Sequence, residues 1–173
     1  MKLDTQMKAF DRARWGLLDE LGVLEPDKLV ARPLPGKWSI LEIVEHMVLA
    51  ERTVLQGLPE AAQSKEREPR LKHQLRYLLV LAVLKARIPV KVPALAMAPT
   101  GTGDLAHWRR LWDENQAWLR TYIEDRAARS ARGTALRHPV AGPISVEHGV
   151  LMSQLHLTIH TRQIRALLRL LQP

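Results

Sequence analysis

Apolar side chains recur at intervals of three and four residues over several long stretches of the sequence, which is the spacing of one face of an α-helix. The first stretch covers residues 3–24, with apolar positions at Leu3, Met7, Phe10, Leu17 and Leu21. It stops at "EPDKLVARPLPGKWS", whose three prolines and one glycine disfavour a continuing helix. The pattern therefore predicts an amphipathic helix over residues 3–24.

A second helix is predicted to begin after Ser39. This residue is a favourable N-cap, and Glu42 three positions later completes the Ser-x-x-Glu pattern of a capping box. The helical pattern continues through "ILEIVEHMVLAERTVLQ" until Gly57 and Pro59, which favour its end.

Three more helices follow the same periodicity. A shorter one is predicted over residues 71–87 and a longer one over residues 104–129, with Asp104 or Thr102 as its cap. The longer helix has an apolar stripe made of Leu105, Trp108, Leu111, Trp112, Trp118, Leu119 and Tyr122. After a loop containing "RHPVAGP", Ser145 caps a last helix that runs nearly to the C-terminus. No alternating strand pattern persists beyond a few residues, so we predict an all-α protein.

These helices and the proline-rich crossovers between them predict a helical bundle that forms one domain over residues 1–173. A chain of 173 residues is long enough for one substantial core and too short to argue for two. Apolar residues make up 46% and charged residues 25%, which favours a folded globular protein over a disordered one.

The composition excludes several classes of protein. The sequence contains no cysteine, so disulfides, thiolate nucleophiles, iron–sulfur clusters and cysteine-ligated zinc are excluded, and any metal must be held by imidazole or oxygen. The longest apolar run, Tyr77 to Leu84, is far shorter than the roughly 20 residues that span a bilayer, so no membrane partner is expected. The first residues include Asp4 and no apolar run, so we expect no secretory signal and a cytoplasmic protein.

The net charge of +8 at pH 7 has two interpretations. It favours nucleic acid or an anionic substrate as a partner, or it reflects a solvated, arginine-rich surface. Clusters such as "ARSARG" support the first interpretation, but no recognised nucleic-acid motif is present and the tryptophans mostly follow helical core spacing. We therefore do not expect nucleic acid as the main partner.

Two histidines, His156 and His160, lie four residues apart in the last predicted helix. Because each residue turns a helix by about 100°, their side chains lie about 40° apart on one face. A helical projection puts them near the middle of the core-facing stripe, with Met152, Leu155, Ile159, Ile164 and Leu167. An unpaired buried polar group costs about 1–3 kcal/mol, so the pair needs hydrogen-bond partners or a shared metal ion. The zincin motif is excluded because Leu157 stands where that motif has glutamate.

A third candidate ligand, His46, lies at the edge of the apolar stripe of the second predicted helix, from which it could reach the bundle interior. Three neutral imidazoles from two helices would leave coordination positions open for water or substrate, as in catalytic metal sites. The other histidines are predicted at the surface, in a loop or at a helix margin: His73, His107, His138 and His148.

The segments "PGKWSILEIVEHMVLAE" (residues 35–51), "VPALAMAP" (92–99) and "HPVAGPISVEHGVLMSQLHLTIHTRQI" (138–164) together resemble the DinB-like superfamily, whose members are also described as YfiT-like metalloenzymes. The resemblance implies an up-down four-helix bundle, here with an additional helix. It also implies a divalent metal ion held by His46, His156 and His160, with nickel or zinc as the typical ion. Relatives often form homodimers.

The resemblance also implies a class of activity. Some members are metal-dependent transferases or isomerases that use low-molecular-weight thiols such as bacillithiol or mycothiol, and others have no known activity. We therefore expect a divalent-metal-dependent transferase or hydrolase that acts on a small molecule, with a low-molecular-weight thiol as candidate cofactor. A non-catalytic metal- or ligand-binding or stress-related module is the alternative.

Two further residues are candidates for supporting roles. Glu42, one turn before His46, is a candidate for a general base or for a hydrogen bond to a metal ligand, and helix capping is its alternative role. Gln163, one turn after His160, could orient a ligand or substrate, or form a buried hydrogen bond between helices.

Overall fold

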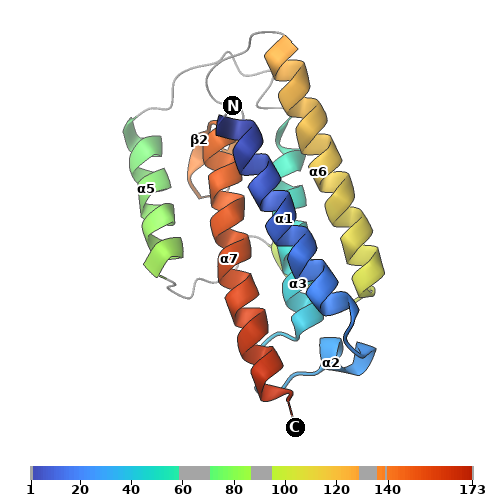
Figure 1. Ribbon diagram of the computed structural model, residues 1–173. Coiled ribbons are helices and arrows are strands. Elements are labelled where there is room, and N and C mark those ends of the chain that lie inside the picture. The colour runs from blue at the N-terminus through green and yellow to red at the C-terminus, as the bar shows by residue number, and fades with distance from the viewer. Residues whose placement is uncertain (1, 59–70, 87–94, 129–135, 139, 173) are drawn as a thin grey trace.

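Four long helices form the body of the protein: α1 (Lys2–Gly22), α3 (Ile40–Gln56), α6 (Leu105–Ala128) and α7 (Val146–Leu170) (Figure 1). The computed structural model describes residues 2–58, 71–86, 95–128, 136–138 and 140–172. Smaller elements are α2 (Pro26–Val30), α5 (Leu71–Ala86) and the 3-10 turn η1 (Leu95–Met97). The all-α class predicted from the sequence is confirmed. No helix in the described part of the chain has the length and apolar character needed to cross a membrane.

The additional helix, α5, determines the directions in which the long helices run. Successive long helices alternate in direction when α5 is counted, and α5 itself stands beside α7 (Figure 1). Because α5 returns the chain between α3 and α6, those two helices run parallel and pack side by side. The neighbours α1 and α7 also run parallel, with Gln6 bonded to Gln154 and Glu20 paired with Arg165.

Side-chain caps begin three of the long helices at the predicted places. The Ser39 hydroxyl accepts the Glu42 N–H while the Glu42 carboxylate accepts the Ser39 N–H, which is the predicted capping box. Of the two candidate caps before α6, Asp104 makes the bond. Ser145 caps α7. These local bonds satisfy N–H groups that the first turn of a helix leaves unpaired.

The core lies along the bundle axis in two clusters. One is formed around Leu18, Ile43 and Trp112, and the other around Met7 and Leu119. The prediction that Trp118 belongs to the core stripe of α6 is wrong, because this side chain is 38% exposed. Trp118 follows Trp112 by six residues, which turns it about 120° away around the helix.

A small antiparallel hairpin, β1 (Leu136–His138) and β2 (Gly142–Ile144), stands where the sequence predicted only a loop. Nδ1 of His138 accepts the backbone N–H groups of Val140 and Ala141, at 3.1 and 3.0 Å, which closes the turn. The hairpin packs on α5 and on the first turns of α7. Strands of three residues are too short to show the alternation that identifies a strand in a sequence.

The hairpin can approach α7 because residue 149 is glycine. A Cβ atom at Gly149 would clash with the side chain of Leu136 in β1. The glycine therefore permits a close contact between helix and strand, which places β1 beside the helix that carries His156 and His160.

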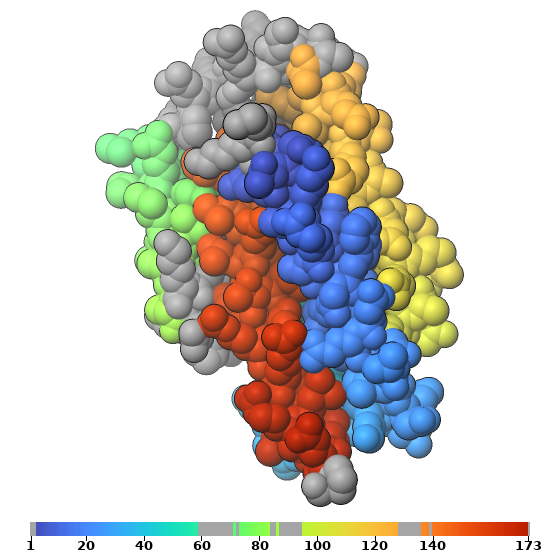
Figure 2. Space-filling view, in the orientation of Figure 1, coloured from blue at the N-terminus to red at the C-terminus, as the bar shows by residue number. Residues whose placement is uncertain are grey.

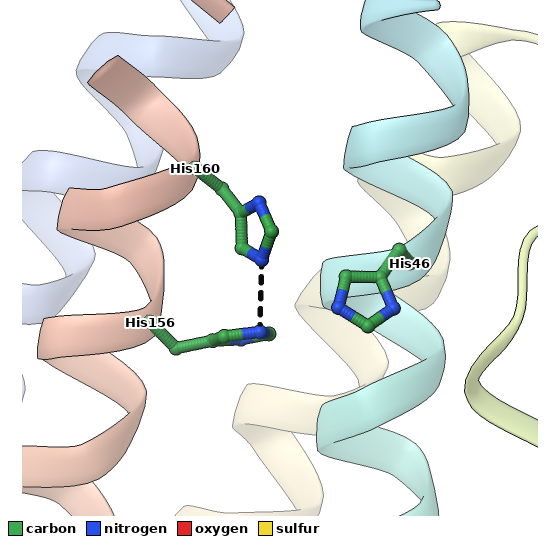
Figure 3. Close-up of side chains that lie close together, drawn as sticks. All are labelled: His46, His156 and His160. Carbon is green, nitrogen blue, oxygen red and sulfur yellow. Dashed lines mark hydrogen bonds between the residues drawn. The ribbon is translucent and has the colours of Figure 1, made fainter. Parts of the chain in front are cut away.

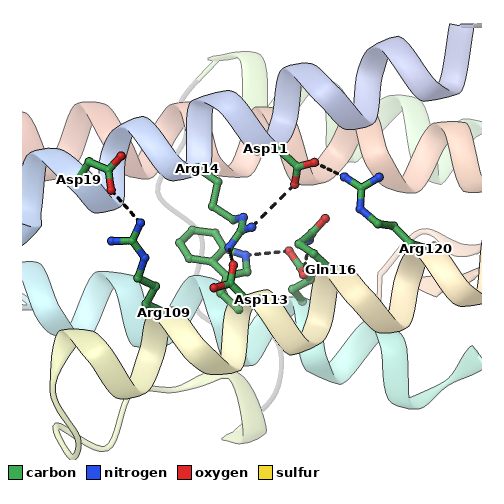
Figure 4. Close-up of polar contacts among 9 residues, drawn as sticks. Asp11, Arg14, Asp19, Arg109, Asp113, Gln116 and Arg120 are labelled. Atoms are coloured by element: carbon green, nitrogen blue, oxygen red, sulfur yellow. Dashed lines mark hydrogen bonds and ion pairs between the residues drawn. The ribbon is translucent and has the colours of Figure 1, made fainter.

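A row of ion pairs joins α1 to α6 (Figure 4). Arg14 is 1% exposed, lies 2.5 Å from Asp113, and places its guanidinium over the Trp112 ring. On the α3 side, Glu51 accepts hydrogen bonds from Trp112 Nε1 and Gln116 Nε2. Two further pairs continue the row, Asp11–Arg120 and Asp19–Arg109. We call Asp11, Arg14, Glu51, Trp112, Asp113 and Gln116 the polar network.

Candidate metal centre

The side chain of His46 is held on α3 by burial and by one hydrogen bond. The capping box begins α3 at Ile40, which brings His46 into the second turn, where it is buried. Its Nδ1 lies 2.7 Å from the backbone oxygen of Met97 in η1. Because a carbonyl oxygen only accepts, Nδ1 carries the hydrogen and Nε2 keeps a free lone pair.

The other two histidines project from α7 toward α3 (Figure 3). The Nε2 atoms of His156 and His160 are 3.0 Å apart. The Nδ1 atom of His160 lies 3.0 Å from Oε1 of Gln163, so this nitrogen donates and the Nε2 of His160 accepts. His156 must then donate the bond between the two rings.

The three imidazoles form a compact group. One nitrogen from each of His46, His156 and His160 lies within 4.8 Å of the other two. The His46 ring centroid is 5.2 and 5.0 Å from those of His156 and His160. A tetrahedral zinc ion with bonds of about 2.0–2.1 Å would separate its ligand nitrogens by roughly 3.3 Å. A movement of roughly 1–2 Å would therefore bring the three nitrogens to the spacing that an ion requires.

Burial keeps all three imidazoles neutral. It lowers the pKa of His46, although the bond to the Met97 carbonyl opposes this. It lowers the pKa of His160 to about 4, with His46 adding to the effect and Gln163 opposing it. The pKa of His156 falls well below its usual value, chiefly through burial and then through His160. A neutral imidazole is the form that binds a metal ion, so the three side chains are in the competent state at neutral pH.

The donor set consists of nitrogen alone. Among the described residues, no carboxylate joins His46, His156 and His160 in the group that could hold an ion. Three neutral imidazoles suit zinc, nickel, copper or iron better than magnesium or calcium, which prefer oxygen ligands. The residues present therefore fit a divalent transition-metal ion.

The histidines of α7 lie within the buried arc of this helix, as the projection predicted. Around the helix axis they lie between the buried Met152 on one side and the buried Ile164 on the other. His156 and His160 keep some exposed surface, and their side chains face α3. Their position between two helices is what allows them to meet His46.

The two candidates for supporting roles differ in what they contact: Glu42 bonds residues outside the histidine group, whereas Gln163 bonds His160. Glu42 caps α3 and forms an ion pair with Arg32 at 2.5 Å, so its carboxylate is engaged away from the histidines. Burial alone would raise the pKa of Glu42, but the bonds from Arg32 and Ser39 lower it. Gln163 contacts His160 within α7, and does not bridge two helices in this contact.

Glu45, which the sequence did not single out, fixes the loop beside the site. Its buried carboxylate accepts hydrogen bonds from Thr100 N, Thr100 Oγ1 and Gly101 N, at 2.7, 2.7 and 3.0 Å. This loop follows η1, whose Met97 carbonyl orients His46. The only sequence signal is an acidic residue in an otherwise apolar turn of α3, next to the candidate ligand.

A fourth histidine lies near the group without belonging to it. His138 ends β1, and burial lowers its pKa to about 4. A positive charge on His138 would further lower the pKa of His156. Its Nδ1 is occupied by the turn of the hairpin. The histidines His73, His107 and His148 lie outside the group of candidate ligands.

A helical bundle with three convergent imidazoles between α3 and α7 defines the class of the protein: an all-α domain with a candidate site for a divalent metal. The family comparison agrees with this class, because the model of the DinB superfamily matches residues 9–164. This match covers most of the chain, and the protein belongs to the DinB superfamily. Comparison with curated proteins and with solved structures gave no significant match.

Proposed function

We propose that this protein is a divalent-metal-dependent enzyme whose ion is held by His46, His156 and His160. The observation that carries the proposal is the convergence of three neutral imidazoles, one nitrogen of each within 4.8 Å of the others. Two of these rings have their Nδ1 atoms engaged by oxygen acceptors, Met97 O and Gln163 Oε1, which leaves Nε2 for an ion.

The reaction class that we propose is a transfer that uses a low-molecular-weight thiol and a small-molecule substrate. A divalent ion in such a site lowers the pKa of a bound water or thiol and so supplies a nucleophile at neutral pH. The uncharged ligands add no negative charge that would weaken this effect. The net charge of +8 would also attract an anionic thiol or substrate.

The residues around the histidines would provide orientation and limit access of water. Trp38 lies with its ring centroid 5.0 Å from that of His46, and forms an apolar wall on that side. Glu45 holds the loop at Thr100 and Gly101, so the carbonyl that orients His46 stays in place. We propose nickel or zinc as the ion, because both accept imidazole nitrogen.

Metal analysis tests the site. The purified protein, stripped with a chelator and then titrated with zinc or nickel, should bind one ion per chain. His160→Ala should lose this binding, whereas the control His148→Ala, at an exposed histidine of the same helix, should retain it. Equal affinity in wild type and His160→Ala would contradict the assignment of the ligands.

An activity screen separates an enzyme from a binding module. Metal-loaded protein is mixed with an electrophile and one thiol at a time, such as bacillithiol, mycothiol or glutathione, and thiol consumption is measured. The proposal expects a rate that depends on both metal and His160. Stoichiometric metal binding without any such rate would favour the non-catalytic alternative.

A further inference from the structure

A row of leucines on α5 is exposed to solvent. Leu71, Leu75, Leu78 and Leu79 each expose between 57% and 71% of their surface. The opposite face of α5 packs on the protein, where Tyr77 is buried and stacks on His148 of α7. The helix therefore buries one apolar face and leaves a second apolar face uncovered.

The exposed leucines form a continuous stripe. With about 100° per residue, positions 71, 75, 78 and 79 fall within about 100° of arc, together with the small residues Ala82 and Ala86. This width is the apolar face of an amphipathic helix that contacts another apolar phase. Scattered single leucines would need no explanation, but a stripe on one helix indicates an interaction surface.

In the sequence of α5 and the segments next to it, the formal charges are all of one sign. Between Glu68 and Asp104 the sequence has six Lys or Arg residues and no acidic residue. Three of these, Lys72, Arg76 and Lys85, belong to α5, and Arg76 is exposed. A stripe of leucines on a cationic helix without acidic residues is complementary to an apolar layer that carries anionic groups.

An anionic membrane surface fits this face better than a second copy of the chain. Two copies meeting through α5 would bring cationic residues together, which is unfavourable. The helix lies along one edge of the molecule (Figure 2). A helix at an edge can enter the boundary between lipid headgroups and acyl chains, where leucines are buried and cations meet phosphates.

We propose that the exposed face of α5 docks this protein on anionic membrane surfaces. The leucines enter the interfacial layer and the exposed Arg76 contacts the headgroups. This revises the expectation of no membrane partner, which rested on the apolar run being too short to span a bilayer. Docking on a surface needs no spanning segment. The proposal is independent of metal binding.

Vesicle sedimentation tests the docking surface with the full chain. Binding is compared for phosphatidylcholine vesicles and for phosphatidylcholine vesicles that contain phosphatidylglycerol, at low and high salt. We expect binding to the anionic vesicles that weakens with salt, and at least about tenfold less binding to the neutral ones. The double variant Leu75→Ser/Leu79→Ser should bind about a hundredfold more weakly, because each leucine loses its burial in the interface.

Two further variants make the test specific. Arg76→Gln should weaken binding about fivefold at low salt, as expected for one cationic contact. Leu170→Ser removes a leucine of similar exposure (55%) at the end of α7 and should bind like wild type. Circular dichroism and thermal unfolding verify that each variant is folded.

Three outcomes would overturn the proposal. These are equal binding to neutral and anionic vesicles, absence of binding to either at low salt, and unchanged binding by the folded double variant. A wild-type dimer that the double variant converts to a monomer, without lipid binding by either, would assign the stripe to self-association instead.

Discussion

Buried polar side chains are paired in different ways on the two sides of α3. Toward α7, His46 meets His156 and His160, three rings whose nitrogens converge without a countercharge. About 140° around the same helix, Glu51 joins the polar network, in which carboxylates, a guanidinium and an amide mostly pair with one another. The network contains several mutual bonds, although Asp11 Oδ1, Arg14 Nε and Gln116 Oε1 lack hydrogen-bond partners among the described residues. In the histidine group, His156 and His160 bond to each other and the Nε2 lone pair of His46 is unused.

Burial changes the pH dependence of stability in opposite directions for the acidic side chain Glu51 and for the histidines. It raises the pKa of Glu51 to about 7, against the opposing bonds from Trp112 and Gln116. It lowers the pKa of His138 and of His160 to about 4. Both effects favour the neutral form, but an acid that stays protonated and a base that stays unprotonated give stability slopes of opposite sign.

The largest expected effect comes from breaking the polar network at its buried cation. Arg14→Ala removes the cation that Asp113 contacts, leaves the buried Asp11 with Arg120 alone, and removes the packing on Trp112. It should lower the free energy of unfolding by about 3–5 kcal/mol. Its matched control, Arg109→Ala, removes an exposed ion pair with Asp19 and should cost less than about 1 kcal/mol. Denaturant titration measures both.

The same variant tests whether the two sides of α3 are independent. Zinc affinity, measured by calorimetry on folded Arg14→Ala, should stay within about twofold of wild type, because additivity holds for distant sites. A large change in zinc affinity would show that the network and the histidine group are coupled.

The second prediction concerns how the carboxyl group of Glu51 changes stability between pH 4.5 and about 7. Because the folded pKa of Glu51, about 7, exceeds its ordinary value of 4.5, the folded state binds more protons between these values. The contribution of Glu51 to stability should therefore fall by about 3 kcal/mol as pH rises from 4.5 to 7. Glu51→Gln should lack this part of the profile and be the more stable protein at pH 8. Parallel profiles for the two proteins would refute the prediction.

The third prediction concerns how the imidazole of His138 changes stability between pH 6.5 and about 4. The folded pKa of His138, about 4, lies below its ordinary value of 6.5, so the unfolded state binds more protons in this window. The contribution of His138 to stability should fall by up to about 3 kcal/mol as pH decreases from 6.5 to 4, which opposes the contribution of Glu51. His138→Asn keeps an acceptor for the turn at Val140 and Ala141 and should flatten this slope. An unchanged slope in a folded variant would contradict it.

The smallest effect is expected at the hydrogen bond that supports His160. Gln163→Leu removes the acceptor of the His160 Nδ1 hydrogen and should weaken zinc binding about 10- to 100-fold. Gln163→Glu keeps an acceptor and should bind zinc at least as tightly as wild type. If both variants match wild type, Gln163 does not orient the ligand.

Local signals account for what the sequence could predict. Ser39, Asp104 and Ser145 are recognisable because a cap and the residues it bonds lie within one helical turn. The i, i+4 spacing placed His156 and His160 together. The position of His46 at the edge of an apolar stripe made it a third candidate, and the family resemblance then implied the three as one ligand set.

Long-range contacts account for what the sequence could not predict. Glu45 finds its partners 55 and 56 residues away, and Glu51 bonds Trp112 at a separation of 61. No periodic pattern reports such pairs. The β1–β2 hairpin and the exposure of Trp118 on α6 were missed for the same reason. Each depends on contacts between elements that are distant in the sequence.

The loop after η1 is attached to two consecutive residues of α3. His46 bonds the carbonyl of Met97, while Glu45 accepts the backbone N–H groups of Thr100 and Gly101. Those two amides are therefore shielded from exchange with solvent deuterium, and their exchange rates depend on the residue that precedes the candidate ligand. An ion that tightens His46 should slow their exchange, so the loop contains a native reporter of occupancy that needs no label and no substrate.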